Sequence, residues 1–338
     1  MELDYQSVVE KPTTLPKKLK IAIQGVHGAF HEIAARSFHP TDDIEIVPAD
    51  TFAELVRKVE TGETDSAVMA IENTIAGSLL GNYNLLNESD LRIRGEVFLR
   101  IKQNLMVLKG VKIEDLKSVH SHPIALQQCV DFFQQYPHIK LVEATDTALV
   151  AKQIQEKGAR KIGAIASTLA AEMYDMDLLA ESIETYKKNY TRFLYLTKNE
   201  VFMDNSKQNS SEYLDVEDRM WDVGNLGRHP KSDIRNTEGV HFAQNSFIVH
   251  DFNKVSTVFT AQHKVGSLHK ALETLALNGC NLTKIQSAPI MDKPWEYMFF
   301  MDFTLDDSSN YIPTMNALKA VTGELRILGE YKSGKYVE

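Results

Sequence analysis

The chain has 338 residues and a formal net charge of −9. This charge lacks the basic bias that nucleic acids and anionic membranes attract, so we expect neither as a partner. The length suffices for two domains, and no apolar run reaches the roughly 20 residues of a membrane span. The acidic N-terminal residues do not have the order of a signal peptide, which favours a cytoplasmic protein.

Strands and helices are predicted to alternate over residues 19–197, after a loose polar arm at 1–18 that contains Pro12 and Pro16. The predicted strands are 19–23, 45–48, 66–71, 97–99, 105–108, a strand ending at 119, 141–143, 162–166 and 192–196. The predicted helices follow residues 29, 51, 123, 146 and 167, and the third of them runs from 124 to 135. This order is typical of an α/β domain with mostly parallel strands.

The first strand leads into a turn that contains Gly25 and Gly28, just before a helix. Free backbone amides at such a helix start favour an anion, although two glycines alone are weak evidence. A dinucleotide fingerprint needs a further glycine in register and an acidic residue after the second strand. That pattern is missing, so we do not expect a nucleotide.

The second half of the chain has a different organisation. Residues 198–252 are rich in turn formers and are predicted to be a connector or insertion. Residues 253–335 show the order βαββαβ, which is the ferredoxin-like split unit. Cys129 and Cys280 lie among apolar residues, where we expect buried, unreactive thiols rather than a disulfide.

Three polar motifs stand at the ends of apolar runs. They are Ile71-Glu72-Asn73, Ser121-His122-Pro123 with Gln128-Cys129, and Asn189-Tyr190-Thr191-Arg192-Phe193. Ligands of open α/β sheets bind outside the carboxyl ends of the strands, so we expect these residues to line one cleft. The set suits a small polyanion, and it contains no thiolate nucleophile and no evident metal-binding pattern. It therefore favours elimination or binding over acyl transfer.

Single residues of these motifs also have ordinary structural interpretations. Ser121 precedes a predicted helix, where serine usually caps. Thr191 suits a β-strand, and Arg192 suits a surface ion pair. Only the combination of the three motifs favours a site.

The three motifs, in this order, make residues 19–197 resemble the catalytic region of prephenate dehydratases. Residues 255–331 are similar to the ACT regulatory domain that follows it, through Gly266-Ser267-Leu268, Asn281-Leu282-Thr283 and Trp295-Glu296-Tyr297. The resemblance implies a two-lobed, type II periplasmic-binding-like catalytic domain, whose second lobe spans about 100–180. It also implies a homodimer or homotetramer.

The resemblance further implies a carbon–oxygen lyase that converts prephenate into phenylpyruvate, water and CO2, with no cofactor and no metal. The implied catalytic residues are Thr191, Ser121, Gln128, Glu72 and Asn73. The implied substrate-binding residues are Arg192, Phe193, Gly28 and His122. Thr191 is expected to protonate the leaving hydroxyl, and Arg192 to hold a carboxylate because its planar group matches one in bidentate fashion. The first turn departs from the family pattern, since Ala29, Phe30 and His31 replace an expected hydroxyl residue.

Phenylalanine is the effector implied for the ACT domain. The implied binding residues are Gly266, Ser267, Leu268, Asn281, Leu282, Gln286 and Ser287. Gln286 and Ala288 replace a charged pair of the family motif, which predicts weaker phenylalanine binding or another effector. Two other functions stay open: an arogenate dehydratase, which shares these motifs, and a non-catalytic metabolite-binding protein.

Overall fold

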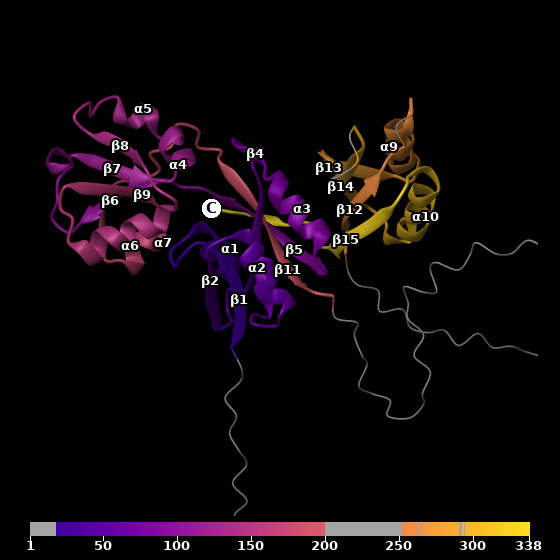
Figure 1. Cartoon of the computed structure of the whole chain (residues 1–338), viewed down its shortest axis with the longest axis horizontal. Helices are drawn as coiled ribbons and strands as arrows, with labels where there is room; N and C mark the ends of the chain where they lie inside the picture. Colours follow the sequence, from indigo (N-terminus) through magenta and orange to yellow (C-terminus); the bar gives the residue numbers. More distant parts are fainter. Residues whose placement is uncertain (1–17, 200–251, 263, 291–292, 294) are drawn as a thin grey trace, which may run out of the picture. The chain divides into compact units, whose positions relative to one another are not determined.

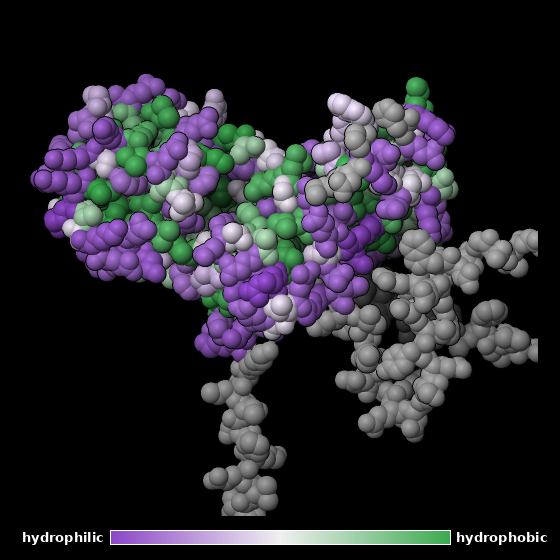
Figure 2. All heavy atoms as spheres, viewed as in Figure 1, coloured by the Kyte–Doolittle hydropathy of each residue, from purple (hydrophilic) through white to green (hydrophobic). Residues whose placement is uncertain are grey.

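The computed structural model describes residues 18–199, 252–262, 264–290, 293 and 295–338 (Figure 1). The predicted arm and the predicted connector therefore lie, except for their edge residues, outside the described part. Most of the face shown in Figure 2 is hydrophilic. Among the described residues, no helix is long and apolar enough to cross a membrane.

The first lobe is built on strands that belong to an 11-stranded sheet. Its strands are β1 (Leu19–Gln24), β2 (Ile44–Ala49), β3 (Ser66–Asn73), β4 (Gly77–Ser78), β5 (Leu91–Arg100) and β11 (Tyr190–Lys198). Its helices are α1 (Phe30–Phe38), α2 (Phe52–Glu60) and α3 (Leu80–Glu88). Thr51 caps α2 as predicted, because its side chain accepts a hydrogen bond from the amide of Glu54.

The second lobe has a sheet of five strands. These are β6 (Asn104–Leu108), β7 (Ser118–Ser121), β8 (Lys140–Glu143), β9 (Ile162–Ala166) and β10 (Met176–Ala180). The 3-10 helix η1 (Ile113–Asp115), α4 (Pro123–Gln128), α5 (Val130–Phe133), α6 (Thr147–Lys157) and α7 (Thr168–Met173) complete the lobe. Asp146 and Ser167 cap α6 and α7 through their side chains, as oxygen-bearing side chains commonly do at helix starts.

Three local predictions are wrong. The strands are not mostly parallel: β11 runs antiparallel to β3 and β5, because the chain returns from the second lobe along it. The predicted helix 124–135 is two helices that meet at Cys129, whose backbone leaves the helical region (φ −111°). Ser121 does not cap α4; His122 does, since its Nδ1 accepts from the amide of Ile124 at 3.3 Å.

The C-terminal region has the predicted βαββαβ order. Its elements are β12 (Lys254–Thr260), α9 (Ser267–Leu277), β13 (Cys280–Pro289), β14 (Tyr297–Leu305), η2 (Ser308–Asn310), α10 (Tyr311–Val321) and β15 (Leu325–Tyr331). The strand order β13-β14-β12-β15 is ferredoxin-like. A further strand that the sequence did not indicate, β16 (Lys335–Val337), pairs with β5.

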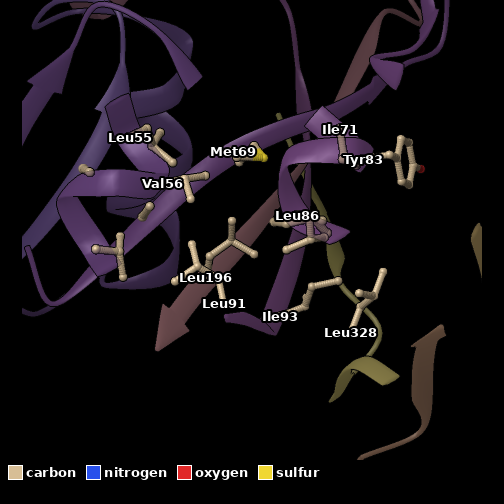
Figure 3. Packing of buried hydrophobic residues seen from close by; sticks show 14 of the residues in the cluster. Leu55, Val56, Met69, Ile71, Tyr83, Leu86, Leu91, Ile93, Leu196 and Leu328 are labelled. Atoms are coloured by element: carbon tan, nitrogen blue, oxygen red, sulfur yellow. The ribbon is translucent and has the colours of Figure 1, made fainter. Parts of the chain in front are cut away.

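One hydrophobic core joins this ferredoxin-like region to the first lobe (Figure 3). Leu86 of α3 and Leu91 and Ile93 of β5 pack in the same cluster as Phe300 and Leu328. β15 also pairs with β5, through Gly329 and Ile93. Apolar burial is the main driving force for folding, so this shared core firmly links the two regions.

Cys129 and Cys280 are both buried and free, as predicted. Burial raises the pKa of the Cys129 thiol to about 12. Thiolate is the reactive form, so this thiol is unreactive at neutral pH.

Candidate functional site

Thr191 and Asn73 form the centre of the candidate site. They are opposite each other on the antiparallel strands β11 and β3. The Nδ2 of Asn73 donates to the Oγ1 of Thr191 at 3.0 Å. The Oδ1 of Asn73 accepts from the amides of Ile75 and Ala76, both at 2.9 Å, which fixes the side chain amide in one orientation.

Asn189 connects this pair to the second lobe. Its Oδ1 accepts from the Nδ2 of Asn73 at 2.8 Å, and its own Nδ2 donates to the Oε1 of Gln128 at 3.0 Å. Gln128 is the last residue of α4, so the chain of hydrogen bonds runs from β3 to a helix of the other lobe. Asn189 has no exposed surface, and an unpaired buried amide is costly, so this connection restrains both lobes.

Gln128 is held by Gln103, which is held in turn by Glu184. The Nε2 of Gln103 donates to the Oε1 of Gln128 at 3.3 Å, and the backbone amide of Gln103 donates to Glu184 at 2.9 Å. Both residues lie where the chain passes between the lobes. The orientation of Gln128 is therefore fixed by the crossing segments themselves.

Glu72 and Arg192 do not lie with Thr191, contrary to the prediction. Successive side chains of a strand point to opposite faces, so the residues next to Asn73 and Thr191 face away from that pair. The carboxylate of Glu72 contacts the Nζ of Lys284 at 2.6 Å.

Arg192 is buried, and all three of its side-chain nitrogens are engaged. They donate to Glu96 at 2.6 Å, to Asp302 at 2.6 Å and to the hydroxyl of Tyr331 at 3.0 Å. Three of its five N–H donors are thus engaged by the protein's own groups, and the residue is only 5% exposed, so it is not open to a substrate carboxylate. The predicted carboxylate-binding role of Arg192 is therefore inconsistent with the structure.

Gly28 is also not available as an anion site. Its amide donates to the Oε2 of Glu32 at 2.9 Å, and Glu32 has no exposed surface. Arg36 balances this carboxylate at 2.6 Å. The protein's own carboxylate thus occupies the position that the sequence assigned to a ligand.

Three predicted residues remain: Phe193 in the first lobe, and Ser121 and His122 in the second. The hydroxyl of Ser121 donates to the carbonyl of Ile165 at 2.6 Å, and Ser121 is fully buried. Phe193 is 1% exposed and packs edge-on against the ring of His31, with ring centroids 5.0 Å apart. His122, half-buried, is the only one of these whose side chain is partly open to solvent.

His31 replaces the expected hydroxyl of the first turn and is a partly buried histidine packed against aromatic side chains of the first lobe. Its Nε2 accepts from the amide of Ala70 at 3.4 Å, and its ring lies 5.5 Å from that of Phe52. Burial lowers the pKa of His31 to about 3. The ring is therefore neutral at physiological pH and is not a source of positive charge for a ligand.

Two further residues were not assigned to the site from the sequence, although Asp146 was predicted to cap a helix. Asn189 heads the third motif, and its place two residues before Thr191 was the available signal. Asp146 lies against Gly25 of the first turn, where a Cβ on that glycine would stand 2.7 Å from its Oδ2. Burial raises the pKa of Asp146, while amide hydrogen bonds from α6 and the charge of His122 oppose that shift.

The residues predicted to bind an effector lie on α9 and β13. Gly266 has the left-handed backbone (φ +83°) at the N-cap position just before α9, and nothing would meet a Cβ there. Asn281, Leu282 and Ser287 are exposed on β13, while the amide of Gln286 donates to the carbonyl of Ser287 at 2.9 Å.

A cavity of about 310 Å³ reaches Leu99 of β5, the residue paired with Thr191, although Thr191 itself is not in its lining. Its lining includes Phe30, Arg36, Arg100 and Thr168, and it does not include the amides that surround Thr191. Arg100 is bonded there to Glu338 at 3.1 Å. In the described part of the chain, no group of three or more His, Cys, Asp or Glu is arranged to hold a metal ion.

Comparisons with known proteins agree with the motifs. A family model described as "Prephenate dehydratase" matches residues 21–201. Arogenate dehydratase/prephenate dehydratase 1 of Arabidopsis thaliana, which is chloroplastic, is 32% identical over 329 residues, or 93% of this chain and 72% of that protein.

Two solved structures share the fold. The prephenate dehydratase of Arthrobacter aurescens, solved with L-Phe, has a TM-score of 0.71 at 22% identity and covers 93% of this chain and 90% of its own. GqqA, described as a novel type of quorum quenching acylase, also has a TM-score of 0.71, at 25% identity, with 93% and 98% covered. These likenesses confirm the predicted fold class. Since the family model spans more than half of the residues and the Arabidopsis relative exceeds 30% identity, the chain belongs to the prephenate dehydratase family.

Proposed function

We propose that this protein converts prephenate into phenylpyruvate, water and CO2, with Thr191 as the proton donor to the departing hydroxyl. The hydrogen bond between Asn73 and Thr191 carries this proposal. Asn73 is the donor in that bond, so the hydroxyl of Thr191 acts as acceptor and keeps its own proton for a ligand. Among the described residues, no hydrogen bond donated by this hydroxyl is present.

The reaction makes modest demands on the protein. Loss of CO2 and hydroxide gives an aromatic ring, so much of the driving force belongs to the substrate. A positioned general acid contributes about 10²–10⁴-fold, and holding the substrate in one orientation contributes further. Asn73 and Asn189 fix Thr191, and Gln128 is held at the same place by the other lobe.

Turnover of prephenate by the purified protein, with a metal chelator and no added nucleotide, tests the proposal. We expect phenylpyruvate to form under these conditions. A requirement for metal, or the absence of product, would contradict it. Arogenate must be assayed in parallel, because curated relatives carry the names of both activities. A higher kcat/KM for arogenate would establish the alternative dehydratase.

An acylase activity, which the description of GqqA names, is less well supported by the arrangement of this chain. Ser121 is the hydroxyl of the second motif, and its proton is donated to a backbone carbonyl rather than to a basic side chain. An acyl-transferring serine needs an adjacent base. A non-catalytic metabolite sensor would bind prephenate without turnover, so the same assay decides that alternative.

L-phenylalanine remains the proposed effector, with weakened binding. The Arthrobacter protein was solved with L-Phe. In this chain Ala288, which stands where the family motif has a charged residue, is 1% exposed within the shared core. Loss of hydrogen bonds to charged groups costs about 1.5–3 kcal/mol each. We therefore expect calorimetry with L-phenylalanine to give weak binding. Tight stoichiometric binding with strong inhibition would show that the charged pair is dispensable.

The assembly and location of the protein are also proposals. The family resemblance favours a homodimer or homotetramer in the cytoplasm. Light scattering coupled to size-exclusion chromatography would give the mass in solution, and a monomer would contradict the proposed assembly.

A further inference from the structure

Four charged side chains join the ferredoxin-like region to the strands of the candidate site. Lys284 of β13 and Asp302 of β14 are opposite each other. Glu72 of β3 and Arg192 of β11 are likewise opposite each other. Lys284 contacts Glu72 at 2.6 Å, and Arg192 contacts Asp302 at 2.6 Å. The two strand pairs are thus bridged at both strands, and we call these four residues the clamp.

The clamp is held in place by its surroundings. The side chains of Arg192 and Asp302 are each 6% exposed, that of Lys284 is 14% exposed, and that of Glu72 is 32% exposed. Lys284 also donates to the hydroxyl of Ser78 at 2.7 Å, and Arg192 to Glu96 at 2.6 Å. Buried charges with several partners have little freedom, because losing one partner leaves an uncompensated charge.

The clamp lies directly behind the candidate site. Asn73, the residue after Glu72, and Thr191, the residue before Arg192, are opposite each other on the other face of the sheet. The pairing register shifts between Arg192 and Phe193, next to this pair. Such irregularities change the direction in which nearby side chains point. The direction of the Thr191 side chain therefore depends on contacts that hold β3 and β11 in place. The charged contacts of Glu72 with Lys284 and of Arg192 with Asp302 hold the two strands.

We propose that Lys284 and Asp302 are positioning residues for the dehydratase reaction: through the clamp, they hold β3 and β11 in the register that presents the Thr191 hydroxyl to the substrate. This inference rests on the proposed function of Thr191. It assigns a catalytic contribution to residues of the ferredoxin-like region that touch neither Thr191 nor Asn73.

Steady-state kinetics of the Lys284→Met variant test the proposal. Lys284 is chosen because it is the more accessible of the two cations of the clamp, so its loss should damage folding least. A small misplacement of reacting groups costs up to about 10²-fold in rate, and we expect kcat to fall at least tenfold with KM little changed. Lys284→Arg keeps the charge and should retain most of kcat. Lys270→Met, at an exposed position of α9, is the matched control and should behave as wild type.

A double-mutant cycle separates the clamp from general damage. Glu72→Gln and Lys284→Met break the same ion pair, so the double variant should lose little more kcat than either single variant. Thermal unfolding must show that all variants are folded. A Lys284→Met protein with wild-type kcat, or losses that multiply in the double variant, would overturn the proposal.

Two measurements keep the proposal distinct from the proposed function. Wild-type turnover tests the function, and the ratio of variant to wild type tests the clamp. If the wild type lacks turnover, the side-chain amide signals of Asn73 in ¹⁵N NMR decide the structural coupling. We expect Lys284→Met to shift these signals and Lys270→Met to leave them in place. Unshifted signals in Lys284→Met would overturn the coupling.

Discussion

Replacing Thr191 by Val is the most direct test of the site, because the structure separates its catalytic effect from its effect on stability. The change keeps shape and removes only the hydroxyl. The Nδ2 of Asn73 then loses one acceptor but keeps two, the Oδ1 of Asn189 at 2.8 Å and the carbonyl of Tyr190 at 3.2 Å. Since Asn73 is not left unpaired, we expect the free energy of unfolding to fall by only about 1 kcal/mol.

The expected kinetic effect of Thr191→Val is much larger. Loss of a general acid lowers turnover by about 10²–10⁴-fold, or roughly 3–5 kcal/mol in the activation free energy. KM for prephenate should change little, because the hydroxyl acts mainly on the departing group. Thr191→Ser keeps a hydroxyl at the same position and should retain much of the activity.

Steady-state assays on prephenate, combined with urea unfolding, measure both quantities on the same preparations. Thr197→Val is a suitable control, since Thr197 lies at the far end of the same strand and bonds to Arg94 rather than to the cluster. Near-normal kcat in a folded Thr191→Val protein would refute the reasoning and move the acid role to another group. A large loss of stability would refute the claim that Asn73 remains satisfied.

Three further predictions address the supporting structure. Asn189→Leu should destabilise the protein by about 1–3 kcal/mol and lower kcat, because the buried amides on both sides lose their partner; thermal unfolding and kinetics measure this. The lowered pKa of His31, about 3, means that the unfolded chain binds this proton more readily, so stability falls as the pH falls from 6.5 towards 3. His31→Phe should remove that loss, which is at most about 2 kcal/mol at pH 5 in urea unfolding. Gly28→Ala should destabilise more than Gly77→Ala in the same assay: both glycines have positive φ, but only at Gly28 would a Cβ meet backbone, at 2.9 Å from Ala170.

The sequence predicted the centre of the site because its signals are local. Asn73 stands at the carboxyl end of β3 and Thr191 at the amino end of β11, and these two ends meet at one edge of the sheet because the strands are antiparallel. The structure brings these two residues together with Gln128, which was also predicted. The order of the C-terminal elements was equally local, since each helix and strand has its own hydrophobic period.

The wrong assignments have two physical causes. Glu72 and Arg192 were grouped with their neighbours, although side chains alternate along a strand and adjacent residues cannot share a face. That error was avoidable from the sequence. Their partners Lys284 and Asp302 were not predictable, because pairing over more than 100 residues depends on which strands meet in the fold.

Glu32 is a case between these two. It lies one helical turn after Gly28, in the position from which a side chain can reach back to a free amide. The sequence therefore held the signal for a self-satisfied turn. Amides at a helix start attract any carboxylate, including one from the same helix. The sequence pattern that predicts an anion site is therefore also satisfied by Glu32.

The alternation of β3 and β11 changes how substitutions in the motifs must be interpreted. One face of the strand pair presents Asn73 and Thr191, and the other presents Glu72 and Arg192 to the ferredoxin-like region. Because all four belong to two short motifs, loss of turnover at any of them looks the same in a simple activity screen. A residue that contacts the substrate and one that holds the strand from behind differ only in how their effects combine with those of Lys284. Substitution at Glu72 should be non-additive with substitution at Lys284, whereas substitution at Thr191 removes the reacting group itself. Membership of a motif therefore does not by itself place a residue in the active site; the face of the strand does.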